Sequence, residues 1–222
     1  GEGRARRSLP VASRSVSAKA RPGLGSPVAA PSFSPMTILL WFKRDLRVAD
    51  HPALVHAARL AGETGAAVLP VYIVEPEYWR LPDTSARQYG FTAESLAALR
   101  DALAGIGLPL VLRVGDAVAE LDRLATAHGA TRLVSHEETG NLWTYGRDRR
   151  VAAWARARGL PWDELAQSGV VRRLASRDGW AGRRERWLRQ APLPVPEGLA
   201  APPGIEPGRL PEAAALGLAP DP

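Results

Sequence analysis

A run of charged side chains between Trp41 and Pro52 is the part of the sequence most able to do chemistry. Lys43, Arg44 and Asp45 directly follow a short apolar run. We therefore expect them at the carboxyl end of a buried strand, where open parallel sheets bind their ligands. Placed there, these charges could take part in ligand binding. The alternative is that they only form ion pairs that fix the loop between a strand and a helix.

Two common kinds of site are excluded by the residue types. No glycine-rich fingerprint of a dinucleotide or triphosphate site occurs, so we expect no standard phosphate-binding loop. The chain has no cysteine, which excludes disulfides and thiolate metal sites. His136-Glu137-Glu138 begins like a metalloprotease helix, but Gly140 stands where the second histidine is required. We therefore predict no metal site.

Residues 172–189 combine positive charge with aromatic rings. This segment holds seven arginines, with Trp180 and Trp187 between them, against Asp178 and Glu185. Such a mixture is typical of nucleic-acid surfaces. It suits docking onto another protein domain equally well, through cation–π contacts and carboxylate pairs.

The periodicity of the apolar residues predicts the elements that would position these groups. Strands are expected at about 38–42, 68–74, 110–114, 132–135 and 162–167. Helices are expected after Pro52 with Asp50 as the N-cap, at about 85–104, between Asp116 and Gly129, and at about 144–158. This alternation predicts an α/β fold, a Rossmann-like parallel sheet of about five strands with helices on both faces.

The net charge of +6 comes from the ends of this predicted domain. Residues 1–35 and residues 172–189 each carry a net charge of +5, whereas residues 36–171 carry −1 and residues 190–222 carry −3. A neutral body does not bind a polyanion over its whole surface. No apolar stretch approaches the roughly 20 residues that a membrane helix needs, so we expect no membrane contact.

Two terminal segments fall outside the predicted domain. Residues 1–35 are rich in Arg, Ser, Ala and Pro and precede Met36, the only methionine. We expect them to be disordered and interpret them as upstream sequence, with an organelle transit leader as the alternative. Residues 191–222 contain nine prolines and no sustained periodicity, which indicates a linker.

Several segments together resemble the photolyase/cryptochrome family. Trp41-Phe42-Lys43-Arg44-Asp45-Leu46-Arg47, with Asp50 and Leu54, matches the opening of that family after its first strand. The resemblance continues through 68–73, 85–88 with Leu96, Leu99 and Leu103, 108–116, and Arg147-Asp148. It covers roughly residues 36–190, nearly all of the predicted ordered chain.

The resemblance implies that residues 36–171 are a light-harvesting antenna domain. In such proteins a folate or a deazaflavin collects light and passes the excitation to FAD in a helical second domain. The implied antenna cofactor is methenyltetrahydrofolate or deazaflavin, and the implied cofactor-binding residues are Lys43, Arg44, Asp45, Glu137, Glu138 and Trp143. Rings can stack on a planar pterin, and carboxylates can accept hydrogen bonds from its N–H groups. Glu137 and Glu138 as solvated loop acids, and Trp143 in ordinary packing, are the alternatives.

The resemblance also implies a parent enzyme. We expect a FAD-dependent deoxyribodipyrimidine photolyase, whose FAD domain is missing from this sequence, so that this chain alone is not catalytic. Arg172–Arg189 would then contact the FAD-binding domain, and damaged DNA would bind only to the full-length protein. A cryptochrome photoreceptor is the alternative, followed by a stand-alone nucleotide-binding module and a flavin-free interaction module. We expect a cytoplasmic location, with organelle targeting by residues 1–35 as the alternative.

Overall fold

The computed structural model describes residues 36–167, 170–172 and 174–219. The strands are β1 (Thr37–Phe42), β2 (Ala67–Val74), β3 (Val111–Val114), β4 (Ala130–His136) and β5 (Trp162–Leu165). The helices are α1 (Pro52–Thr64), α2 (Pro76–Trp79), α3 (Ala86–Ala104), α4 (Ala117–Ala127), α5 (Leu142–Arg158), α6 (Trp180–Leu188) and the 3₁₀-helix η1 (Ala213–Leu216). The leader predicted at residues 1–35 lies outside the described residues.

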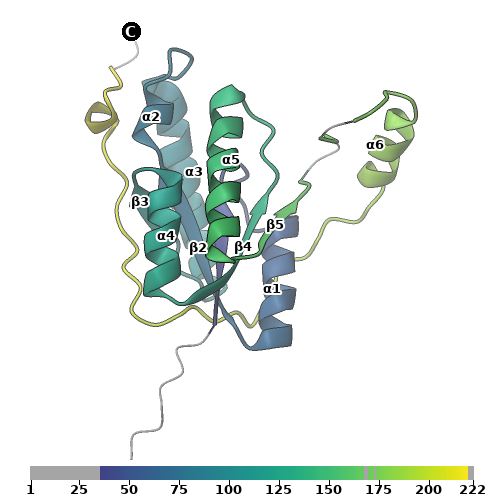
Figure 1. The fold of residues 1–222 in the computed structure, drawn as a ribbon, viewed down its shortest axis with the longest axis horizontal. Coiled ribbons are helices and arrows are strands. Elements are labelled where there is room, and N and C mark those ends of the chain that lie inside the picture. Colours follow the sequence, from purple (N-terminus) through teal and green to yellow (C-terminus); the bar gives the residue numbers. More distant parts are fainter. Residues whose placement is uncertain (1–35, 168–169, 173, 220–222) are drawn as a thin grey trace, which may run out of the picture. The chain divides into compact units, whose positions relative to one another are not determined.

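The five strands form one parallel sheet in the order β3-β2-β1-β4-β5, which confirms the predicted fold class (Figure 1). From β1 the chain winds outward to β2 and β3, and then crosses back to β4 on the other side of β1. The strand order therefore reverses between β1 and β4. In open parallel sheets, ligands bind outside the carboxyl ends of the strands at this reversal.

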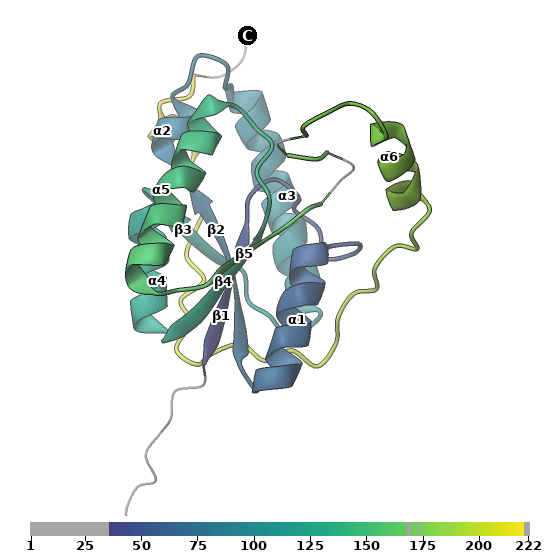
Figure 2. The same cartoon turned by 45° about the vertical axis from the view of Figure 1, so that its right-hand side comes forward.

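Alternate residues of β1 serve two separate cores. Leu40 and Phe42 pack with α1 and α3 on one face of the sheet, and Leu39 and Trp41 pack with α4 and α5 on the other. Figure 2 shows the two helix pairs on opposite sides of the sheet. Successive side chains of a strand point to opposite faces, so a strand that is apolar along its whole length must be covered on both.

The helix ends agree with the sequence prediction at two places and differ at one. Asp116 caps α4 by accepting a hydrogen bond from the N–H of Ala119 at 3.1 Å, and Gly159 ends α5 with φ at 69°. The predicted cap of α1 by Asp50 is wrong. His51 is the N-cap, because its Nδ1 accepts from the N–H of Leu54 at 2.9 Å.

Asp50 takes a different role because of a contact with a distant part of the chain. Its φ is +48°, and its Oδ1 accepts from the N–H of Leu193, while its own N–H donates to the carbonyl of Leu193. Asn and Asp tolerate this left-handed conformation better than most residues. The N-cap position therefore passes to the next residue.

The proline-rich segment that was predicted as a linker lies along the α/β domain. Its backbone accepts hydrogen bonds from the N–H groups of Val68 and Leu112. Leu216 is 1% exposed and packs in the core that also contains α3. Figure 1 shows the segment, in yellow, passing beneath the strands and then along the β3 side. The domain core thus includes residues far beyond the predicted boundary.

Helix α6 was not among the predicted helices. None of its residues is buried, and Trp180 and Leu188 are exposed apolar side chains.

Within the part of the chain that the structure describes, no helix is long and apolar enough to cross a membrane.

Candidate ligand-binding site

A cavity of about 480 Å³, called cavity 1 here, opens at the carboxyl ends of β1, β2 and β4. Its polar wall comes mainly from the loop after β1 and from the region between β4 and α5. Rings from β2, α2 and α3 form much of the rest. The residues used in the argument below are Lys43, Arg44, Asp45, Arg47, Tyr72, Glu75, Tyr78, Trp79, Phe91, Thr92, Glu138, Thr144 and Arg147.

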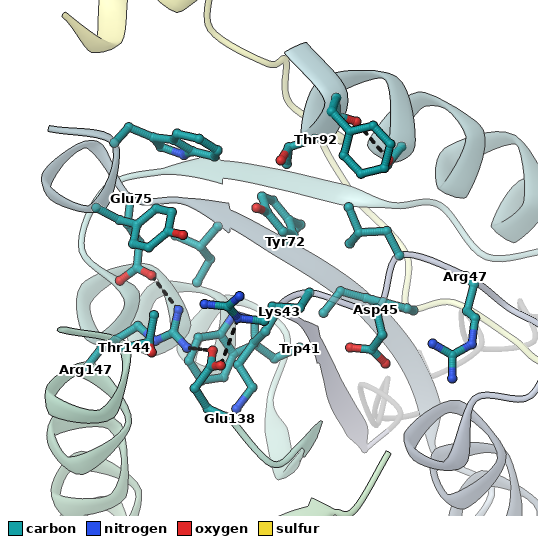
Figure 3. Close-up of a pocket in the computed structure, with 18 residues that line it drawn as sticks. Trp41, Lys43, Asp45, Arg47, Tyr72, Glu75, Thr92, Glu138, Thr144 and Arg147 are labelled. Carbon is teal, nitrogen blue, oxygen red and sulfur yellow. Dashed lines mark hydrogen bonds and ion pairs between the residues drawn. The ribbon is translucent and has the colours of Figure 1, made fainter. Parts of the chain in front are cut away.

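Arg147 is the centre of an ion-pair network at one end of cavity 1. Its guanidinium lies 2.9 Å from Glu75 Oε2, 2.8 Å from Glu138 Oε2 and 3.0 Å from Asp148 Oδ1. All four side chains are at most 8% exposed. Figure 3 shows Glu75 and Arg147 at one end of the cavity and Asp45 and Arg47 at the other. A planar guanidinium with five donors suits this sharing better than an ammonium group.

The network separates the pKa values of its carboxyl groups. Burial raises the pKa of Glu75 to about 7, although Arg147 opposes the shift. Glu75 Oε1 has no hydrogen-bond partner among the described residues, which also disfavours the charged form. Burial acts in the same direction on Glu138, but Arg44, Arg147 and Lys43 hold its pKa below the ordinary value.

The Lys43 side chain is buried and held by contacts within the protein. Its Nζ pairs with Asp148 at 2.9 Å and lies 4.9 Å from the ring centroid of Trp41 and 5.6 Å from that of Trp162. The side chain is 2% exposed, and burial lowers its pKa despite the pair with Asp148. Lys43 therefore holds β1 to α5, as expected of a cation–π and ion-pair contact.

Arg44, in contrast, is 47% exposed. Its Nε donates to Glu138 Oε1 at 2.9 Å, and the N–H of Gly140 donates to the same oxygen at 2.8 Å. A Cβ at position 140 would lie within 3 Å of the Arg44 guanidinium, of Thr144 Oγ1 and of Glu138 Oε1. Glycine is thus needed at position 140 so that the backbone can approach this ion pair.

Asp45 is enclosed by two histidine rings. Its Oδ2 lies 2.9 Å from His51 Nε2 and contacts His136 Nδ1. The amide of Gln167, oriented to donate, reaches both carboxylate oxygens. Burial by itself would raise the pKa of Asp45, but the hydrogen bonds from His136 and His51 hold it well below its usual range.

Asp45, His51 and His136 are placed as three metal ligands could be, which the sequence did not reveal. Their hydrogen bonds argue against that role. His51 Nδ1 accepts from the N–H of Leu54, and His136 Nε2 accepts from the N–H of Ala53 at 3.1 Å. A neutral imidazole has one donor and one acceptor nitrogen, so the nitrogens that face Asp45 carry the protons. A protonated nitrogen cannot ligate a metal ion.

The structure brings together only some of the predicted cofactor-binding residues. Lys43, Arg44, Asp45 and Glu138 line cavity 1. Glu137 lies 3.4 Å from Arg172 Nε, outside the cavity 1 lining. Trp143 contacts the ring of Tyr78 and lines a second cavity of about 220 Å³, called cavity 2, together with Glu75 and Asp116.

Several residues of cavity 1 were not predicted. Tyr72 lies in β2 and Glu75 directly follows it, and Thr92 lies on α3 across the cavity (Figure 3). Phe91 precedes Thr92 on α3 and also lines cavity 1. Glu75 could have been found, because it follows the second predicted strand at the same sheet edge as Lys43. No comparable sequence pattern marks Phe91 as a residue of the cavity. It is 72% exposed on a helix whose periodicity marks only the buried face.

Comparison with protein families gives one assignment over most of the described domain. The family model for DNA photolyase matches residues 38–176. Residues of this chain are 36% identical over 107 residues to "Cryptochrome DASH, chloroplastic/mitochondrial" of Arabidopsis thaliana, a match that covers 46% of this chain and 18% of that protein. They are 41% identical over 87 residues to the deoxyribodipyrimidine photo-lyase of Salmonella typhimurium, which covers 39% of this chain and 18% of that one.

Solved structures agree with this assignment. The class III photolyase of Agrobacterium tumefaciens superimposes with a TM-score of 0.68 at 27% identity, over 88% of this chain and 41% of that chain. The matched part thus spans less than half of that structure and about a fifth of each of the two relatives above.

Proposed function

Because the chain belongs to the DNA photolyase family, which includes cryptochromes, we propose that its α/β domain is a light-harvesting antenna domain. Cavity 1 carries this proposal. It lies where the strand order reverses, and its volume of about 480 Å³ falls in the range of cofactor pockets, which is about 300–1,000 Å³.

The lining of cavity 1 fits a planar pigment such as a deazaflavin or methenyltetrahydrofolate. Tyr72, Tyr78, Trp79 and Phe91 supply rings that can stack on a flat heterocycle. Thr92 and the exposed Arg44 supply hydrogen-bond donors. When bound, such a pigment would absorb light and pass the excitation to FAD. The buried network around Arg147 keeps the walls in place before binding, which lowers the entropic cost of ordering them.

We further propose that the domain acts with an FAD-binding domain in a light-driven deoxyribodipyrimidine photolyase, with methenyltetrahydrofolate or deazaflavin as the antenna and FAD in the partner domain. Support for such a domain contact comes from α6, whose Trp180 and Leu188 are exposed and whose neighbourhood is rich in arginine. A cryptochrome is the second candidate, since the identity to the Arabidopsis cryptochrome DASH is close to that to the Salmonella photolyase.

Pigment uptake tests the antenna proposal. The 222-residue chain is titrated with 8-hydroxy-5-deazariboflavin and, separately, with methenyltetrahydrofolate, and binding is followed by pigment fluorescence. We expect one of them to bind with one-to-one stoichiometry and a dissociation constant in the micromolar range or below. Absence of binding by both contradicts the proposal, and selective binding of ATP would instead support a nucleotide-binding module.

A further inference from the structure

Cavity 2 shares Glu75 with cavity 1 but differs from it in size and in charge. It lies beside the ends of β2 and β3 and the start of α5. Among the described residues that line it, three are acidic and none is basic: Glu75, Glu77 and Asp116, together with Pro76, Gly115 and Trp143. Its volume of about 220 Å³ is below the range of cofactor pockets, which is about 300–1,000 Å³. Cavity 2 therefore suits a small cationic group rather than a fused ring system.

Two of the three carboxylates keep oxygens that the protein does not satisfy. Glu75 is 6% exposed, and its Oε1 has no hydrogen-bond partner among the described residues, although Oε2 pairs with Arg147. Glu77 is exposed, and its side chain has no ion pair within the described part of the chain. Asp116, in contrast, already pairs with Arg150. An unpaired buried acceptor costs free energy, which a hydrogen-bond donor on a ligand can offset.

Trp143 supplies an aromatic wall to the same cavity. Its ring contacts Tyr78, at 5.5 Å between ring centroids, and also lines cavity 2. The face of an indole ring attracts cations. Inside the protein, Lys43 and Arg147 take this position over Trp41. Trp143 has no such cation within the described residues, so this position is open to a ligand.

The arrangement favours an organic cation over a metal ion. Within the described residues, the only acidic and histidine side chains that come close enough together to hold a metal ion are Asp45, His51 and His136. The carboxylates of cavity 2 thus do not converge on one point. A primary ammonium group has three N–H donors and can reach separate oxygens. Its alkyl stem packs against apolar surface, such as the ring of Trp143.

We propose that cavity 2 binds a primary alkylammonium group, with Glu77 and Glu75 as its acceptors and Trp143 packed against its stem. The group belongs to a free diamine or to a lysine side chain of a partner protein, because both present the same chemistry. This site is separate from the antenna function, since it needs no pigment in cavity 1.

Glu75 should make this binding depend on pH. Burial raises the pKa of Glu75 to about 7, and Asp116 acts in the same direction, whereas Arg147 and the N–H of Ala117 oppose the shift. Tyr72 of β2 also faces Glu75 but stays neutral, because burial raises its own pKa. An alkylammonium keeps its proton throughout this range. A bound cation favours the charged carboxylate, so the ligand should bind about fivefold more tightly at pH 8 than at pH 6.

A pair of small ligands tests the role of charge. Butylammonium and 1-butanol share an alkyl chain and differ in charge. Their binding to the 222-residue chain is followed by NMR, through the indole N–H of Trp143 and the backbone N–H of Gly115, which both line cavity 2. Trp143→Phe identifies the indole signal. We expect a dissociation constant on the order of 1 mM for butylammonium and binding at least about tenfold weaker for 1-butanol.

Two further ligands distinguish the sources of the ammonium group. Tighter binding of 1,5-diaminopentane than of Nα-acetyllysine amide would assign the site to a free diamine. Tighter binding of the lysine derivative would assign it to a protein side chain. Both results support the site, because both depend on an ammonium group in cavity 2.

Variants then locate the acceptors. Glu77→Gln should weaken butylammonium binding by about three- to fivefold, as for an exposed charge pair. Glu75→Gln should remove the dependence on pH between 6 and 8. Glu94→Gln is the matched control, since Glu94 is exposed on α3 and is absent from the lining of cavity 2. It should keep both the affinity and its pH dependence. Circular dichroism checks that each variant is folded.

Three results would overturn the site. Equal binding of butylammonium and 1-butanol would show that charge is not recognised. Binding that leaves the signals of Trp143 and Gly115 unchanged would place the ligand elsewhere. An affinity that neither Glu77→Gln nor Glu75→Gln alters would exclude both acceptors. None of these results bears on the antenna function, because no pigment is present in the experiment.

Discussion

His51 and Asp45 face each other at the start of α1, with His51 Nε2 2.9 Å from Asp45 Oδ2. The other nitrogen of the same ring caps the helix by accepting from the N–H of Leu54. One neutral imidazole therefore joins the end of β1 to the first turn of α1. Both of its hydrogen bonds require that the ring carry a single proton.

Acid should destabilise the domain through this ring. Burial lowers the pKa of His51, although Asp45 opposes the shift, and His136 and Arg47 disfavour its charge. Below its unfolded pKa of about 6.5, the unfolded chain binds the proton more readily, so the free energy of unfolding falls as the pH falls. Urea unfolding at pH 7.5 and pH 5 should show this loss. His51→Asn, which keeps a capping side chain, should reduce the loss, whereas His56→Asn should not.

Arg147→Met should cost about 3–5 kcal/mol of unfolding free energy, because it leaves Glu75, Glu138 and Asp148 buried without their shared cation. Arg150→Met is the control on the same helix. Arg150 pairs with Asp116 at a site where its side chain is 50% exposed, so the loss should stay below about 1 kcal/mol. Equal losses in chemical denaturation would contradict a special role for Arg147.

Glu75→Gln should change how stability depends on pH. The folded pKa of Glu75 is about 7, above its ordinary value, because of burial. The folded protein therefore holds a proton that the unfolded chain releases, and the wild-type stability falls as the pH rises from about 4.5 to 7. A glutamine side chain does not bind or release a proton in this pH range, so the variant lacks this loss of stability. The stability of the variant relative to wild type should rise by up to about 3 kcal/mol over this range.

The matched control for this measurement is Glu94→Gln, because Glu94 is exposed on α3. Thermal or urea unfolding at pH 5, 6, 7 and 8 provides the comparison. A constant difference for Glu75→Gln would mean that this carboxyl group does not retain its proton in the folded state.

Phe91→Ala and Trp143→Ala test which cavity holds the pigment. Phe91 lines cavity 1 and is largely exposed, so its removal should weaken pigment binding up to about tenfold without loss of stability. Trp143 was predicted from the sequence as a cofactor-binding residue and lines cavity 2. A loss of similar size for Trp143→Ala would place the pigment in both cavities, and a loss confined to Phe91→Ala would restrict it to cavity 1.

Helix α6 should bind a hydrophobic dye. Trp180 is 39% exposed and Leu188 is 50% exposed. We expect 1-anilinonaphthalene-8-sulfonate fluorescence with the wild-type chain. The double variant Trp180→Ser and Leu188→Ser should lower it, with a change in unfolding free energy within about 0.5 kcal/mol, since no contact in the core is lost. Dye binding that is unchanged in the double variant would argue against α6 as an apolar docking surface.

The sequence alone was sufficient for the sheet and for part of cavity 1. Continuous apolar runs at 38–42 and 68–74 indicate strands covered on both faces. A glycine or aspartate at a helix end interacts only with residues within one turn of it, so the sequence alone can indicate where the helix begins or ends. Because parallel strands end at one edge, Lys43, Arg44 and Asp45 could be expected beside Glu138, and all four line cavity 1. These features depend on local periodicity and on the topology that it implies.

The partners of those residues were decided only by the tertiary structure. Glu75 and Arg147 are 72 positions apart, and His51 and His136 meet at Asp45 from α1 and β4. Asp50 lost its predicted capping role because Leu193, from the far end of the chain, binds it. Charge pairs and burial depend on which distant segments the folded chain brings together. Local patterns therefore located the site, whereas packing determined which of its charges are neutralised inside the protein and which, such as Arg44, remain exposed to a ligand.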